Sequence, residues 1–401
     1  MKYVSKAILL FIAFVIIVVM IVVKITVDKS GRVIDKGTVV NIGRDGLGKG
    51  EGDSWPMFHG EPELQGYTQN VLSDSLTVLW KFKTNDEIKS SPAIYEGLVY
   101  IGSADANVYA IDLENGNLVW SYKTGGAIEA TACVVDGSVF IGSSDSFMYA
   151  LDMKTGQLKW KYETGGKILG SANWIRSGDE QDIQIVVGSY DSQLFCLNAK
   201  DGKVIWIYKT DSYVNGTAAI DDGRIVFGGC DGIIHVVSAK NGEDIRQIEA
   251  DAYIAGSAAV LEGKAYVGNY ENAFMKVDIE SGKILWKYME SDAPYFSSPA
   301  IADGRVVFGG RDNRIHCLEA DSGKKVWTFQ TLGEVDSSPV ICGEKVVVGC
   351  GDGRLYMVSL SDGRKVWSFE VGQAITSSPA VAGDRVVVGC DDGYVYAFGG
   401  R

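Results

Sequence analysis

Apolar and polar residues alternate in short runs along most of the chain, and turns rich in glycine separate the runs. One complete unit is residues 90–120, SSPAIYEGLVYIGSADANVYAIDLENGNLVW, with turns at Glu96-Gly97, at residues 102–105 and at Asn115-Gly116. Asn-Gly and similar pairs favour two-residue hairpin turns, because both turn positions adopt positive φ. Each unit is therefore predicted to be a four-stranded antiparallel meander.

The unit recurs, and a tryptophan marks the fourth strand of nearly every copy. The tryptophans are about 40 residues apart, except for one gap of twice that length in which Arg246 takes the missing place. Each tryptophan except Trp80 comes four residues after a turn glycine, so its ring is predicted to pack between neighbouring repeats in the outermost strand. The seven structural docking residues are Trp80, Trp120, Trp160, Trp206, Trp286, Trp327 and Trp367.

The two ends of the repeated region complement each other. Its last unit has only three strand-like runs, whereas residues 76–84 (LTVLWKFKT) form a lone fourth strand. Eight small sheets arranged radially can bury both faces of each sheet, and joining the lone strand to the last unit leaves no open edge. The prediction is an all-β fold, an eight-bladed β-propeller of four-stranded antiparallel blades whose last blade is closed by an N-terminal strand.

The N-terminal region differs in kind from the repeats. Residues 7–23 (AILLFIAFVIIVVMIVV) are an unbroken apolar run that, as a helix, would span roughly 25 Å, close to the apolar thickness of a bilayer. The interpretation is one uncleaved N-terminal transmembrane helix, with a cleaved signal peptide as the alternative. Lysines on both sides balance, so charge does not set its orientation. The predicted domains are the membrane anchor at 1–27, a flexible polar linker at 28–53 and the propeller at 54–401, with a lead-in at 54–75 and repeats at 76–401.

Composition limits the chemistry. The net charge of −13, without a lysine-rich run, argues against a nucleic-acid partner, since phosphate binding needs a basic surface. The seven cysteines include no CxxC pair, and the three histidines are scattered, so neither a metal site nor a disulfide framework is predicted.

Two motifs carry a resemblance to a known family. Residues 110–120 (AIDLENGNLVW) and 150–160 (ALDMKTGQLKW) resemble the tryptophan-docking motif of the PQQ-like, quinoprotein-type repeat β-propellers, and residues 55–68 (WPMFHGEPELQGYT) resemble the segment that precedes many of them. One branch of that family contains PQQ-dependent dehydrogenases, which hold PQQ and calcium and typically show an adjacent cysteine pair and long inserted loops. This chain has no such pair, and its only sizeable insertion is near residues 177–182.

The other branch, which contains BamB-like propellers, is non-catalytic, and the compact repeats are closer to it. The resemblance implies a protein without cofactor or enzyme activity that binds proteins in the cell envelope. It also implies a place at the cytoplasmic (inner) membrane with the propeller on the extracytoplasmic, periplasmic side. BamB is a lipoprotein, however, whereas this chain has no lipid-accepting cysteine near its apolar run.

Comparing the repeats with one another shows where they vary. Variable positions occur in the bend between the second and third strands and just before each first strand, and large aromatic residues gather there in the third to sixth units. Tyrosine and arginine are enriched at interface hot spots. The candidate partner-binding residues are Tyr190, Tyr213, Tyr253, Tyr270, Tyr295, Phe296 and Arg311.

The leading hypothesis is a membrane-anchored, non-catalytic scaffold that uses these residues to bind an extended peptide or another protein. The alternatives are that the tyrosines only pack on loop backbones, or that the ring is a PQQ- and calcium-dependent oxidoreductase or binds a small ligand in its channel.

Overall fold

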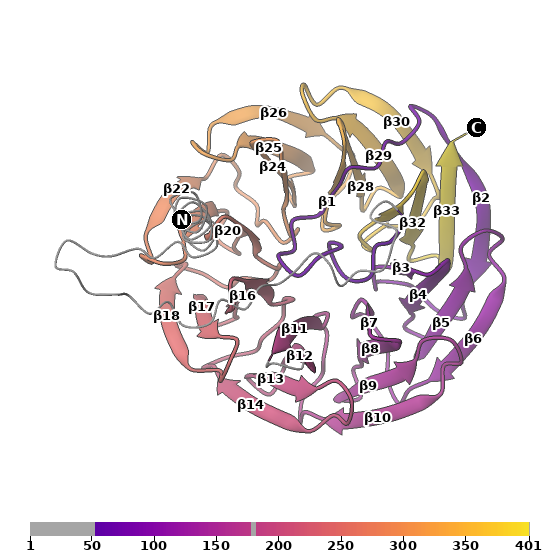
Figure 1. Ribbon diagram of the computed structural model, residues 1–401. Coiled ribbons are helices and arrows are strands. Elements are labelled where there is room, and N and C mark those ends of the chain that lie inside the picture. The colour runs from indigo at the N-terminus through magenta and orange to yellow at the C-terminus, as the bar shows by residue number, and fades with distance from the viewer. Residues whose placement is uncertain (1–52, 178–181, 401) are drawn as a thin grey trace, which may run out of the picture. The chain divides into compact units, whose positions relative to one another are not determined.

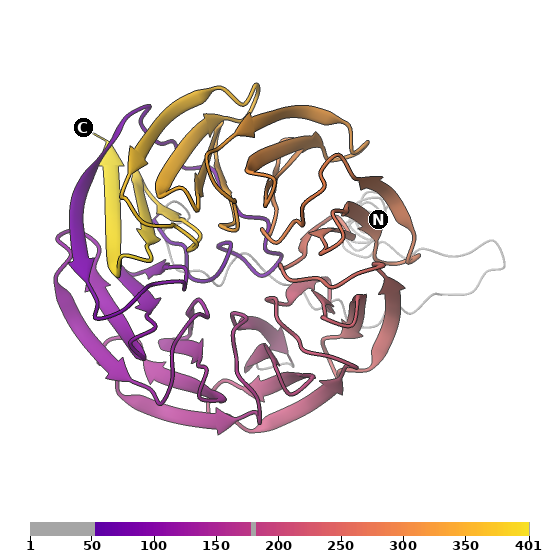
Figure 2. The ribbon, with the colours of Figure 1, turned by 180° about the vertical axis from the view of Figure 1, so that it is seen from behind.

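The computed structural model describes residues 53–177 and 182–400, and within these ranges the chain is built from strands and turns without a helix. Eight sheets surround a common axis, and the chain passes through them in sequence order, from indigo to yellow in Figure 1. The same ring seen from behind shows the loops that join the blades (Figure 2). The prediction of an all-β, eight-bladed propeller with antiparallel blades is confirmed.

The first four blades have four antiparallel strands each. Their strands are β3 (Ala93–Tyr95), β4 (Leu98–Gly102), β5 (Asn107–Asp112) and β6 (Leu118–Lys123); β7 (Cys133–Val135), β8 (Ser138–Gly142), β9 (Phe147–Asp152) and β10 (Leu158–Glu163); β11 (Asn173–Ser177), β12 (Asp182–Ser189), β13 (Gln193–Asn198) and β14 (Val204–Lys209); and β15 (Ala219–Asp221), β16 (Arg224–Gly228), β17 (Ile233–Ser238) and β18 (Asp244–Glu249).

The remaining blades repeat this plan up to β33 (Tyr394–Gly400). Their strands are β19 (Ala259–Leu261), β20 (Lys264–Gly268), β21 (Phe274–Asp278) and β22 (Ile284–Tyr288); β23 (Ala300–Ala302), β24 (Arg305–Gly310), β25 (Arg314–Glu319) and β26 (Lys325–Gln330); β27 (Val340–Cys342), β28 (Lys345–Gly349), β29 (Arg354–Ser359) and β30 (Lys365–Glu370); and β31 (Ala380–Ala382), β32 (Arg385–Gly389), β33 and the N-terminal strand β2 (Leu76–Lys83).

The eighth blade joins the two ends of the repeated region. Strand β2 pairs antiparallel with β33, with Trp80 opposite Ala397. The same register places Trp120 opposite Ala110 within the first blade. The lone strand therefore takes the place of the missing fourth strand, as the sequence predicted.

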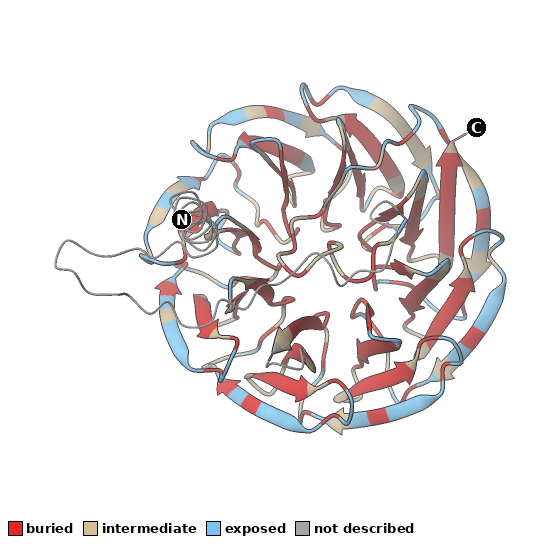
Figure 3. Ribbon diagram, in the orientation of Figure 1, coloured by how far each residue is buried: buried red, intermediate tan, exposed pale blue. Residues whose placement is uncertain are grey.

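Burial falls from the axis outward, as Figure 3 shows. The second and third strands of each blade are buried nearly throughout, because they lie between two neighbouring sheets. The fourth strands alternate between buried and exposed positions, since only one side of each faces the core. The tryptophans occupy the inward positions of these outer strands.

Six of the tryptophans dock on the next blade in the same way. The indole N–H of Trp80 donates to the carbonyl oxygen of Leu113 (2.8 Å), and its ring lies so close to the turn glycine Gly116 that an added Cβ would be 2.7 Å from it. Gly116 has a positive φ of 74°, so the turn needs glycine for its backbone as well as for the space. The other five, Trp120, Trp160, Trp206, Trp286 and Trp327, donate to Met153, Ala199, Ala239, Ala320 and Leu360.

Trp367 is the exception to the predicted docking pattern. The eighth blade has no turn between its third and fourth strands, because its fourth strand comes from elsewhere in the chain. The Trp367 ring packs edge-on against Phe398 of β33 instead (5.7 Å between centroids) and does not dock on a turn glycine.

The lead-in lies along the inner strands around the axis. Its first part bonds in both directions with Ile94 of β3, through the backbone of Trp55. It then runs past the first strands of the later blades to β1 (Tyr67–Thr68), which pairs parallel with β27 and makes the seventh blade five-stranded. Figure 1 shows this segment in indigo across the centre of the ring. The sequence predicted a lead-in at this place but not its path.

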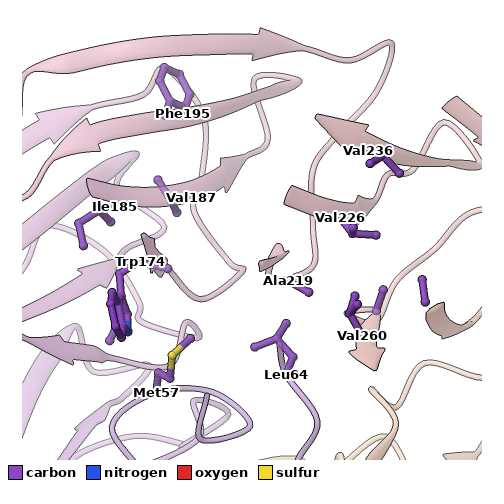
Figure 4. Close-up of a cluster of buried hydrophobic side chains, with 14 of the residues drawn as sticks. Met57, Leu64, Trp174, Ile185, Val187, Phe195, Ala219, Val226, Val236 and Val260 are labelled. Carbon is purple, nitrogen blue, oxygen red and sulfur yellow. The ribbon is translucent and has the colours of Figure 1, made fainter. Parts of the chain in front are cut away.

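Side chains of the lead-in complete the core. Met57 and Leu64 are fully buried and belong to the same apolar cluster as residues of the second to fifth blades. Figure 4 shows Met57 beside Trp174 and Leu64 facing Ala219 and Val260. The lead-in therefore closes part of the channel from within.

The predicted anchor at 1–27 lies outside the described residues, as does the predicted linker apart from Asp53. Between residues 53 and 400, leaving out 178–181, no helix is long and apolar enough to cross a membrane.

Candidate partner-binding face

Two sets of loops share one face of the ring, which we call the pocket face. The bend between the second and third strands of each blade bonds, through its backbone N–H, to the connection that leads into that blade. Examples are Ala104 to Glu87 (2.9 Å) and Tyr270 to Tyr253 (2.8 Å). The opposite face, the turn face, holds the turns between the first and second and between the third and fourth strands. The variable positions found in the sequence thus lie on the same side.

A pocket of about 410 Å³ opens on the axis at this face. Phe58 of the lead-in contributes to its lining. All eight variable residues that precede the first strands line it: Lys89, Glu129, Leu169, Asn215, Ala255, Phe296, Asp336 and Thr376. Sequence comparison of the repeats identified this set, whereas the contribution of Phe58 could not be seen without the path of the lead-in.

Hydroxyl groups join the blades just below these residues. The Ser257 hydroxyl accepts a hydrogen bond from the N–H of Thr217 (2.8 Å), and the Ser257 N–H donates in turn to Ser298 (2.8 Å). Equivalent bonds run from Thr131 through Ser171 to Thr217 and from Ser298 through Ser338 and Ser378 to Ser91. These hydroxyl groups form a hydrogen-bonded ring around the axis. The second serine of the repeated Ser-Ser-Pro motif could have predicted this ring from the sequence, but it was not among the predictions.

Six of the seven candidate residues lie on the pocket face in two contacting groups, which together we call the aromatic sector. Tyr190 stacks on Tyr213 with centroids 4.8 Å apart, and Tyr270 contacts both Tyr253 (6.0 Å) and Phe296 (5.5 Å). Most of these contacts cross from one blade to the next. The members of the sector are Tyr190, Tyr213, Tyr253, Tyr270, Phe296 and Arg311.

The sector presents large rings to solvent. Tyr213, Tyr253 and Tyr270 are 49%, 58% and 52% exposed. Tyr190 is held more firmly, since its hydroxyl donates to the side-chain oxygen of Asn215 (2.8 Å). The rings therefore pack against one another while about half of each of these three faces solvent.

Arg311 ends the sector with its charge already engaged. Its guanidinium lies over the Phe296 ring (4.1 Å to the centroid) and donates two hydrogen bonds to Asp336 (2.9 and 2.7 Å). The hydrogen bonds to Asp336 raise the pKa of Arg311 above its usual value. The arginine therefore stays charged and oriented.

The prediction that Tyr295 belongs to the partner-binding set is wrong. Its side chain is fully buried, and its ring packs edge-on against Phe308 (5.1 Å). Tyr295 occupies the place against Gly268 that Ile128 occupies against Gly102, which is a core position. Aligning it with Ile88 and Ile128 rather than with Tyr213 would have shown this.

Aspartates fix the shape of the bends. The Asp145 carboxylate accepts a hydrogen bond from the Tyr149 hydroxyl (2.6 Å) and one from the backbone N–H of Phe147 (3.0 Å). In the third blade Phe195 replaces the tyrosine and Gln193 donates to Asp191 instead (2.8 Å). The other oxygen of Asp191 is buried without a partner, and burial raises the pKa of this carboxyl. These carboxylates hold loops in place and do not converge on one point.

The pocket face is strongly acidic. Its connections and bends carry eighteen acidic residues and three basic ones, Lys89, Lys167 and Arg311, in a chain whose net charge is −13. These loops are residues 84–91, 103–106, 124–131, 143–146, 164–171, 190–192, 210–217, 229–232, 250–257, 269–273, 289–298, 311–313, 331–338, 350–353, 371–378 and 390–393.

Eight radial blades, tied by tryptophans that dock on turn glycines, define the class of PQQ-like repeat propellers. The chain belongs to the family whose model is described as outer membrane protein assembly factor BamB, which matches residues 71–181, 172–245 and 230–401. No curated protein sequence matches it at a significant level.

Solved structures show the same fold at low sequence identity. BamB from Moraxella catarrhalis aligns with a TM-score of 0.69 and 20% identity over 81% of this chain and 100% of that one. The quinohemoprotein alcohol dehydrogenase from Comamonas testosteroni gives a TM-score of 0.74 and 12% identity over 86% and 80%. The computationally designed protein Ika8 gives a TM-score of 0.69 and 17% identity over 79% and 97%. The fold is thus common to BamB, an alcohol dehydrogenase and a computationally designed protein.

Two side chains of the axial pocket that could offer oxygen ligands to a calcium ion beside PQQ are engaged by other protein groups. Such a site needs several oxygen ligands that converge on the metal. In this pocket Asp336 is engaged by Arg311, and the side-chain oxygen of Asn215 accepts from Tyr190. Among the described residues no three His, Cys, Asp or Glu side chains come together to hold a metal ion.

Proposed function

We propose that this chain is a membrane-anchored, non-catalytic scaffold that binds another protein of the cell envelope through the pocket face of its propeller. The observation that carries the proposal is the aromatic sector, in which three tyrosines about half exposed pack against neighbouring rings. Rigid amphipathic rings give large contact area at low entropy cost, as in protein interfaces. Family membership supports the same role.

The tethering part of the proposal comes from the sequence. The apolar run at 7–23 is long enough for one transmembrane helix, and the polar residues that follow it give the propeller reach from the membrane. We propose the cytoplasmic membrane, with the propeller on the extracytoplasmic side, by analogy with the family.

A pull-down tests the scaffold role. The full chain is crosslinked in native membranes, captured, and its partners are identified by mass spectrometry in parallel for the wild type and for a Tyr253→Ala, Tyr270→Ala variant. The expected result is one or more envelope proteins that the variant fails to capture. Tyr95→Ala, which also alters a partly exposed tyrosine but lies on β3 near the turn face, is the matched control.

Recovery of the same partners by the Tyr253→Ala, Tyr270→Ala variant would contradict the proposal. A pull-down in which neither protein captures an envelope partner would do so as well.

A second candidate function is small-ligand binding, because the axial pocket is large enough for a small molecule and is lined mainly by hydroxyl, amide and charged groups. Mass spectrometry of the natively purified chain would detect such a ligand. A bound ligand that is lost in Thr376→Val, at the pocket rim, would favour this candidate over the scaffold.

A further inference from the structure

We propose that the aromatic sector recognises an extended, positively charged peptide segment whose arginine or lysine side chains lie over the tyrosine rings. This inference rests on the proposed function, because it names the chemistry of the partner that the scaffold binds. It follows from three features of the pocket face. The Arg311 guanidinium already lies over an aromatic ring there, exposed tyrosine rings lie beside it, and the loops of this face carry an excess of acidic residues.

At one place in the sector, a cationic side chain of the protein itself already lies over an aromatic ring. The Arg311 guanidinium lies over the Phe296 ring at 4.1 Å and pairs with Asp336, so an aromatic face and a carboxylate together hold a cation. Lys161 lies in a similar way over the Phe147 ring at 4.2 Å. The ring face attracts the cation through its quadrupole, and the carboxylate supplies the opposite charge.

The next places along the sector offer open aromatic rings, with acidic residues close to two of them in the sequence. Tyr213, Tyr253 and Tyr270 are each about half exposed. Asp211 and Glu271 are exposed beside Tyr213 and Tyr270 in sequence, and within the described ranges neither carboxylate forms an ion pair. These places are therefore open to a guanidinium or ammonium group of a partner.

The distribution of charge over the two faces also favours a positively charged partner at the pocket face. The pocket face has eighteen acidic residues against three basic ones in its loops. Some acidic residues are paired with bases on both faces, on the pocket face for example Asp251 with Lys287, and on the turn face three pairs are within that face. These three pairs are Lys203 with Asp201, Arg224 with Asp221, and Lys264 with Asp278. A cationic segment is therefore steered to the pocket face.

A peptide-binding measurement tests the inference. The full chain in detergent is titrated against a short fluorescein-labelled peptide of alternating arginine and glycine, and against the same peptide with neutral citrulline in place of arginine. Binding is followed by fluorescence anisotropy at low and at physiological salt. We expect the arginine peptide to bind more tightly, and added salt to weaken it.

Variants separate recognition by the sector from general attraction to an acidic protein. Tyr270→Leu is expected to weaken binding of the arginine peptide about tenfold, whereas Tyr270→Phe, which keeps the ring, retains most of it. Asp211→Asn with Glu271→Gln should weaken it as well. Asp221→Asn with Asp222→Asn removes the same charge from the turn face and should leave the affinity nearly unchanged.

Equal affinity for the citrulline peptide would overturn the inference. So would an unchanged affinity in Tyr270→Leu, or an equal loss in the two pairs of charge variants, since attraction would then be non-specific. The peptide titration and the pull-down distinguish a wrong partner chemistry from a wrong scaffold role. Envelope partners lost in Tyr253→Ala, Tyr270→Ala, without binding of the arginine peptide, would leave the scaffold role standing and remove the basic-segment chemistry.

Discussion

Arg246 lies over the turn glycine Gly282, in the place where six other blade junctions have a tryptophan over the equivalent glycine. The Nε of Arg246 is buried there without a hydrogen-bond partner. This junction lacks both the apolar area and the indole-to-carbonyl bond of the others, although the turn that would receive an indole is present.

Arg246→Trp is therefore expected to stabilise the ring. A tryptophan could donate to the carbonyl of Ile279, which corresponds to Leu113 at the first junction, and would add about 1–2 kcal/mol to the free energy of unfolding. Urea unfolding followed by circular dichroism measures the change. Arg246→Leu, which removes the unpaired nitrogen without restoring the bond, should gain less; an equal or larger gain would show that the docking bond is unimportant.

The tryptophans should differ in their contribution to stability. Trp120→Ala removes a buried ring and its bond to Met153, and the expected loss is about 3–5 kcal/mol. Trp367→Ala should lose clearly less, because Trp367 is only partly buried and does not dock on a turn. Denaturant midpoints of the two variants, measured side by side, check the order. Equal losses would mean that packing on Phe398 replaces docking in full.

His59 should make stability depend on pH. Its ring is buried in the lead-in, and burial lowers its pKa from 6.5 to about 4, although the Leu64 carbonyl works in the opposite direction. Between these values the unfolded chain binds a proton that the folded chain excludes. The stability from neutral His59 is thus fully present above pH 6.5 and is lost as the pH falls towards 4, by about 3 kcal/mol.

A variant isolates this contribution from that of the carboxylates. His59→Asn keeps a donor for Leu64 but does not titrate, so its free energy of unfolding should fall less than that of the wild type between pH 7 and pH 4.5. Urea titrations at the two values give the difference. Parallel losses in both proteins would assign the pH dependence to other groups.

The hydroxyl ring around the axis should be sensitive to single deletions. Ser257→Ala leaves the buried N–H of Thr217 without its acceptor, and the expected loss is about 1–3 kcal/mol. Thr131→Val is the matched control, since the Thr131 hydroxyl accepts none of the hydrogen bonds described above for this ring while its N–H still donates to Ser171. Thermal unfolding of the two variants compares them, and equal shifts would argue against the ring as a source of stability.

Cys230 should be the thiol that reacts first in the folded protein. It is partly exposed in the bend of the fourth blade, whereas the other six cysteines are buried. Burial raises the pKa of Cys230 too, so its labelling by a maleimide at neutral pH should be slow but selective. Mass spectrometry would count one label in the native state and seven in denaturant. Labelling of Cys230→Ser at the same rate would contradict this.

The blades could be predicted because their signals are local. A turn such as Asn115-Gly116 and the tryptophan four residues later specify a hairpin and its place at the rim, and repetition removes ambiguity. Closure of the ring by β2 followed from counting strands. The exception at Trp367 was also in the sequence, since the last unit has no turn glycine on which that ring could dock.

The candidate site was less predictable. Tyr213 and Tyr295 are both tyrosines just before a first strand, yet a shift of one position puts Tyr295 into the core while Tyr213 stays exposed. The path of the lead-in depends on pairings with strands hundreds of residues away, such as Tyr67 opposite Ile341, and no local pattern encodes these. The contribution of Phe58 to the pocket could not be foreseen for the same reason.

The pairing of β2 with β33 also governs when the fold can be completed during synthesis. Strand β2 and the lead-in leave the ribosome before the blades that follow them, but their partners β33 and β27 are made only after the intervening blades. Until then Leu64 and Met57 lack their final surroundings, and an exposed β2 edge could pair wrongly with another chain. A nascent chain of this protein therefore stays vulnerable until β33 emerges, and a chaperone that shields β2 during that interval would raise the yield of closed rings.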